Sequence, residues 1–62
     1  MRPIIGQRVE VDLFGLRVQG VLSGATVASG TIVAMAWGTI TVRLDANTLT
    51  EVTVGPARLL PA

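Results

Sequence analysis

The stretch "TITVRLD", from Thr39 to Asp45, has the clearest alternation of apolar and polar residues in the chain. Its apolar residues Ile40, Val42 and Leu44 alternate with polar or charged ones, and this period of two is typical of a β-strand with one buried face. An amphipathic α-helix would space its apolar residues three or four positions apart. The pattern therefore predicts a half-buried strand over residues 39–45.

The same alternation occurs on both sides of this stretch. "RVEVDL", from Arg8 to Leu13, alternates three aliphatic residues with three charged ones, and the segment from Glu51 to Val54 repeats the pattern over four residues. Three separate stretches with a period of two predict an all-β chain. We expect one domain over residues 1–62, built from about five short antiparallel strands.

The uncharged window from Val18 to Val42 presents an alternative, a helix that crosses a membrane. Its length suffices, since about 20 apolar residues span a bilayer. However, the window is rich in β-branched residues, which favour extended backbone. It is also rich in glycines, and each glycine weakens a helix by about 1 kcal/mol relative to alanine. The alternation of the next strand also continues through Arg43 and Asp45. The window is therefore expected to hold strands and turns, with no membrane span.

Within this window, "TIVAMAW" (Thr31 to Trp37) is apolar at every position after its threonine. Strict alternation would place Ile32, Ala34 and Ala36 on one face and Val33, Met35 and Trp37 on the other. A strand that is apolar on both faces is usually covered twice, and a neighbouring subunit is the expected second cover.

The turns are expected between these strands. The repeated "GTI" (Gly30 to Ile32 and Gly38 to Ile40) is taken as two strand starts, separated by a turn near residues 36–38. Residues 13–16 are expected to form a turn or loop, and residues 45–49 are rich in turn formers. Near the C-terminus, residues 57–59 are expected to form a 3-10 or single helical turn. Residues 23–30 fit either a strand or a loop.

The composition limits how this chain can be stabilised. A chain of 62 residues buries only about 60% of its unfolded surface, so one core is marginal without additional support. The absence of Cys and His excludes disulfides and thiolate or imidazole metal sites, and no acidic segment matches a calcium loop. No cofactor is expected. Because 50% of the residues are hydrophobic and only 15% are charged, we expect a homo-oligomer or a protein partner to cover part of the surface.

The residue alphabet also argues against catalysis. The chain has no His, Cys, Tyr or Lys, so the usual general bases and activated nucleophiles are missing. Glu10 and Asp12 share one strand face and could form an acid–base pair. Arg8 and Arg43 supply countercharge, which favours a solvated strand face instead. We therefore expect no enzyme activity.

The chain also resembles the SH3-like small-barrel superfamily, in its bacterial KOW- or Tudor-type form. The resemblance implies about five strands in a bent, partly open barrel, and it does not imply a single function, because this fold serves many. The residues that match its pattern are Gly6, Val9, Val11, Gly30, Ile32, Gly38, Ile40, Val42, Leu44, Asp45, Val52, Val54 and Leu59.

A fainter similarity links "VTVGP", from Val52 to Pro56, to the Val-Gln-Ile-Tyr-Pro segment of type II dihydrofolate reductases. Thr53 and Gly55 stand where that family has its essential Gln and its Tyr, so no catalytic residue carries over. The similarity implies only that such a barrel can be stable as a ring or a pair.

Two functions fit this sequence. The first is an interaction or assembly module that self-associates or docks on a larger protein, with Trp37 as a core or interface anchor. Its interface residues are expected to be Phe14, Val33, Met35 and Trp37.

The second is a small nucleic-acid-binding barrel that uses Arg8, Arg17 and Arg43. Interleaved acidic residues weaken this alternative, because such binding needs a concentrated positive field. The cytoplasm is the default expectation for localisation, since the first twelve residues lack the apolar stretch of a signal peptide.

Overall fold

The computed structural model describes residues 3–16, 26–46 and 48–60. Five strands and one short 3-10 helix form in this part of the chain, and every strand pair is antiparallel. The all-β prediction, the number of strands and the turn near the C-terminus are confirmed. In chain order the elements are β1 (Arg8–Asp12), β2 (Val27–Ala36), β3 (Thr39–Leu44), β4 (Glu51–Val54), the 3-10 helix η1 (Pro56–Arg58) and β5 (Leu59–Leu60).

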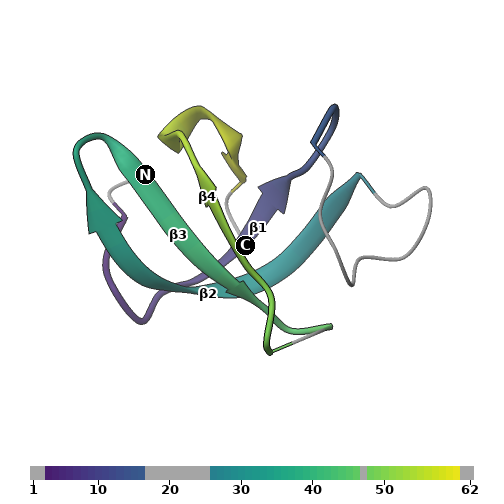
Figure 1. Cartoon of the computed structure of the whole chain (residues 1–62), viewed down its shortest axis with the longest axis horizontal. Coiled ribbons are helices and arrows are strands. Elements are labelled where there is room, and N and C mark those ends of the chain that lie inside the picture. Colours follow the sequence, from purple (N-terminus) through teal and green to yellow (C-terminus); the bar gives the residue numbers. More distant parts are fainter. Residues whose placement is uncertain (1–2, 17–25, 47, 61–62) are drawn as a thin grey trace.

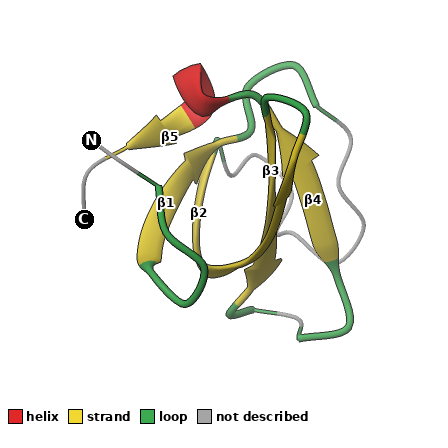
Figure 2. Ribbon diagram, turned by 90° about the vertical axis from the view of Figure 1, so that its left-hand side faces the viewer, coloured by secondary structure: helices red, strands yellow, loops and turns green. Residues whose placement is uncertain are grey.

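The strands form one strongly curved sheet with the order β4-β3-β2-β1-β5. β2 curves along the long axis of the molecule, from the hairpin that joins it to β3 at one end to the far end of β1 at the other (Figure 1). Seen from the side, the sheet curls so that β1 and β5 lie opposite β3 and β4 (Figure 2). The result is a barrel-like shape with two sheet edges, at β4 and β5.

The concave side of this sheet holds an entirely aliphatic core. Residues that alternate with polar ones along β1, β3 and β4 are almost fully buried, because a period of two places them all on one face. Neither aromatic residue takes part. The buried residues are Val9, Val11, Leu13, Ile32, Ile40, Val42, Leu44, Val52, Val54 and Leu59.

The turn between β2 and β3 is a two-residue hairpin loop formed by Trp37 and Gly38. Both residues have positive φ angles, 50° and 75°, which identifies a type I′ turn. This turn matches the twist of the flanking strands, and the Thr39 hydroxyl also donates to the Ala36 carbonyl at 2.6 Å. The predicted turn is confirmed.

A β-bulge at Val33 corrects the expected faces of β2. Ile32 pairs with Val42, but the next pair joins Ala34 to Thr41, so Val33 is an extra residue in β2. The extra residue reverses the alternation, and Met35 therefore pairs with Ile40 on the core-facing side. The prediction that Val33, Met35 and Trp37 share the face opposite Ile32 is wrong.

Gly30 lies in the middle of β2 and does not start it. It is opposite Val9 on one side and Leu44 on the other. A Cβ atom here would lie 2.6 Å from Val42 Cγ1 and closer still to the Arg43 carbonyl oxygen, so only glycine fits where the sheet bends. The first of the two expected strand starts is therefore wrong.

The described part of the uncharged window is extended, since residues 27–36 and 39–42 all lie in β2 and β3. Residues 27–30 are thus strand, and residues 23–25 lie outside the described residues. Within the described ranges, no helix is long and apolar enough to cross a membrane.

Candidate interaction surface

The tip of the β2–β3 hairpin presents the only tryptophan to solvent. Trp37 is 100% exposed, and its backbone adopts a left-handed conformation that a bulky side chain rarely takes. Met35 lies near the same tip and is also exposed, although it is on the core-facing side of β2. Of the two positions expected for Trp37, the core of this chain is therefore excluded.

A second exposed apolar segment lies at the same end of the molecule. Ile4 to Gln7 forms a turn closed by a 3.0 Å bond from the Gln7 N–H to the Ile4 carbonyl, with Gly6 at φ 92°. Two bonds hold this turn beside the bulge: the Gly6 N–H donates to the Ile32 carbonyl at 2.7 Å, and the Ile32 N–H donates to the Gln7 carbonyl at 2.9 Å. Ile4 and Ile5 remain exposed on it.

Residues 3–7 and the β2–β3 hairpin lie at one end of the long axis (Figure 1). We call the exposed apolar residues there, Ile4, Ile5, Met35 and Trp37, the hairpin end. Val33 is half-buried in the bulge beside this region. Large apolar residues exposed at one end of a molecule are candidates for an interaction site.

The structure places Phe14 away from the hairpin end. β1 ends at Asp12, opposite Val27 at the start of β2, whereas Trp37 follows the last residue of β2. The turn that carries Phe14 lies at the other end of the molecule (Figure 1). Phe14 is exposed there with Leu16 and Val27. The four expected interface residues thus lie at two opposite ends.

Besides Leu16 and Val27, sequence reasoning missed three more exposed apolar residues. Ile4 and Ile5 precede the first strand, and Leu49, at 94% exposure, lies in the connection between β3 and β4. No sequence signal could have identified them, because an isolated apolar residue in a turn has no period from which its burial can be read.

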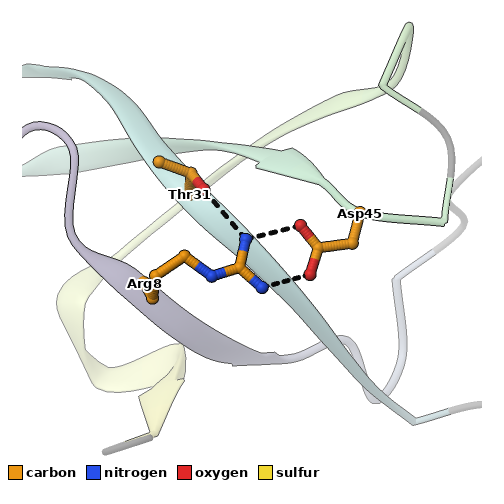
Figure 3. Close-up of polar contacts among 3 residues, drawn as sticks. All are labelled: Arg8, Thr31 and Asp45. Atoms are coloured by element: carbon orange, nitrogen blue, oxygen red, sulfur yellow. Dashed lines mark hydrogen bonds and ion pairs between the residues drawn. The ribbon is translucent and has the colours of Figure 1, made fainter.

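Arg8 forms the best-defined polar contact on the convex face (Figure 3). Its guanidinium makes a two-pronged ion pair with Asp45: Nη1 donates to Oδ1 at 2.6 Å, and Nη2 donates to Oδ2. Nη1 also donates to the Thr31 hydroxyl at 3.0 Å. The hydrogen bonds and the opposite charge of this pair raise the pKa of Arg8, and the hydrogen bond from Arg8 lowers the pKa of Asp45.

Arg43 also forms an ion pair with a carboxylate. It lies between Thr31 and Glu51 in the sheet register, and its Nη2 and Nε donate to Glu51 Oε2 at 3.0 and 3.3 Å. Arg8 and Arg43 therefore lie in one row across the convex face, each neutralised by a carboxylate. Arg17 lies outside the described residues. A row balanced in charge does not supply the positive field that nucleic-acid binding requires.

The remaining charged residues of β1 and η1 have structural contacts. Asp12 accepts a 2.9 Å hydrogen bond from the Phe14 N–H, which closes the turn after β1. Arg58 Nη1 donates to the carbonyls of Asp12 and Phe14 at 3.2 and 2.8 Å. In the part of the chain that the structure describes, no three carboxylates come together as a metal site would require.

Comparison with known proteins does not identify a family. No protein-family model matches the chain, and neither a curated protein nor a solved structure matches it significantly. Any function must therefore be argued from the residues and their geometry.

Proposed function

We propose that this chain is a non-catalytic interaction and assembly module that binds a second copy of itself, with the hairpin end as part of the interface. The observation that carries the proposal is Trp37, which is fully exposed at a positive φ angle on a type I′ turn. Such turns favour Asn, Asp or Gly at this position. A tryptophan costs backbone strain there and leaves a large apolar ring in water, and uncompensated features of this kind cluster at functional sites.

The fold supports this proposal in two ways. Among the described residues, the core is small and contains only aliphatic side chains, so association would add burial to a marginal core. The strand order, with a 3-10 turn before the last strand, also supports assignment to the SH3-like small barrels. The alternative function, nucleic-acid binding through Arg8, Arg17 and Arg43, gains no support from Arg8 and Arg43, which are both ion-paired.

The test is Trp37→Asn, with size measured by light scattering on a column. Asn suits the left-handed position, so the variant should fold. At concentrations low enough to dissociate the wild type, it should melt at or above the wild-type temperature. We expect the wild type to be larger than the 6.5 kDa of one chain and the variant to shift towards the monomer.

The matched control is Phe14→Asn, which removes an exposed aromatic residue at the opposite end. It should leave the size of the assembly unchanged. A wild type that is monomeric up to millimolar concentration, or an assembly that Trp37→Asn leaves intact, would show that the proposed function is wrong.

A further inference from the structure

The two edges of the sheet differ in how they are protected. At one edge, β5 pairs with β1, and the Arg58 guanidinium occupies the carbonyls of Asp12 and Phe14 beyond it. At the other edge, β4 has no strand beside it among the described residues. Proteins protect such an edge with charged residues, Pro, bulges or very short strands. β4 has four residues with Glu51 as its one charge, it contains no Pro, and its pairing with β3 is regular.

The direction of the backbone groups of β4 follows from its register. The Leu44 N–H donates to the Thr50 carbonyl at 3.1 Å, so these two residues form a hydrogen-bonded pair. Such pairs alternate along an antiparallel ladder. Val52 and Val54 therefore direct their backbone groups towards β3, and Glu51 and Thr53 direct theirs outward from the free edge.

We infer that a second copy of this chain pairs with this edge, β4 against β4 in antiparallel orientation around a two-fold axis. This inference rests on the proposed function and names the surface that carries the self-association. With the axis at Val52, Glu51 lies opposite the partner subunit's Thr53, and Thr53 lies opposite the partner subunit's Glu51. All outward backbone groups of these residues are then paired, and the two Glu51 carboxylates are not directly opposed.

The same pairing places a residue of the second copy near Trp37 of the hairpin end. Thr39 follows the Trp37–Gly38 turn, one residue before the Ile40–Val54 pair, so the hairpin lies at the C-terminal end of β4. An antiparallel copy brings the N-terminal end of its own β4 to this place, and with it the partner subunit's Leu49. Trp37 and Leu49 are the two most exposed large apolar residues in the part of the chain that the structure describes. They thus come to the same end of the interface in both halves of the dimer.

The test is Thr53→Pro, with Thr53→Val as its control. Among the backbone groups of β4, proline removes only the outward N–H of Thr53, which makes no bond to β3. An edge strand accepts proline at such a position. Both variants lose the 3.0 Å hydroxyl contact between Thr41 and Thr53. We expect a folded monomer for Thr53→Pro and a wild-type dimer, twice the 6.5 kDa chain mass, for Thr53→Val.

Hydrogen exchange of the wild type provides a second readout that does not depend on a variant folding. The amides of Glu51 and Thr53 should become protected as the protein concentration rises, whereas those of Val52 and Val54 should be protected throughout. Self-association that Thr53→Pro leaves intact, or fast exchange at Glu51 and Thr53 in the assembled protein, would overturn the β4 pairing. A wild type that never associates would instead refute the proposed function.

Discussion

At the scale of single residues, Gly30 explains how this chain closes a sheet around so few side chains. It is buried in the middle of β2, where β2 passes too close to β3 for any Cβ atom. The bend that follows brings strands from both halves of the sheet around one core (Figure 2). A larger residue would have to move the backbone of β3.

Gly30→Ala is therefore expected to destabilise the fold by about 1–3 kcal/mol, the usual cost of forcing extra atoms into a packed site. Urea denaturation followed by circular dichroism measures the change. Gly55→Ala is the control, because its backbone is extended and no atom lies within 4 Å of the new Cβ. Equal stability of the two variants would contradict the close approach of β2 and β3.

At the scale of elements, ion pairs join strands across the convex face. Arg8 of β1 reaches across β2 to Asp45, which directly follows β3 (Figure 3). Arg43 and Glu51 join β3 to β4. These pairs neutralise the charged groups of the convex face. They also occupy two of the arginines that nucleic-acid binding would use.

The Arg8–Asp45 pair predicts a loss of stability in acid. Because the pKa of Asp45 is lower in the folded chain than its ordinary value of 3.8, the pair contributes fully above that value. Its contribution is lost as the pH falls through the folded pKa. Thermal melts across this pH range should show a decline for the wild type that is shallower in Asp45→Asn.

Arg8→Gln removes the other half of the same pair and should reduce the acid decline by the same amount. The acid decline of the double variant should equal that of either single variant, since all three lack the same titrating ion pair, and the contact between Arg8 and the Thr31 hydroxyl does not titrate. Additive effects of the two substitutions would indicate that Arg8 and Asp45 act through separate contacts.

At the scale of the whole molecule, the small core and the exposed apolar residues at the hairpin end have a common consequence. If association buries apolar residues that the single chain leaves exposed, the folded state is favoured by mass action. The melting temperature of the wild type should then rise with protein concentration. That of Thr53→Pro should stay constant, and calorimetry over a wide concentration range compares the two. A wild-type melting temperature that does not depend on concentration would contradict this coupling.

The positions of the strands could be predicted from the sequence alone. β1, β3 and β4 lie where the period of two predicts them, because one face of each strand contacts the core and the other contacts water. The turn at Gly38 and the 3-10 turn before Leu59 are also predicted from the sequence, although Trp37 goes against the residue preference of its turn position. The expected interface residues could be chosen only as apolar side chains, without knowing where each one points.

The direction of each of these side chains depends on tertiary contacts. The bulge at Val33 reverses the faces of β2, the length of β2 separates Phe14 from Trp37, and the sheet register brings Arg8 to Asp45. Each of these depends on which residue of one strand lies opposite which residue of another. A shift of one residue moves every side chain to the other face, and no local pattern in this chain specifies that shift.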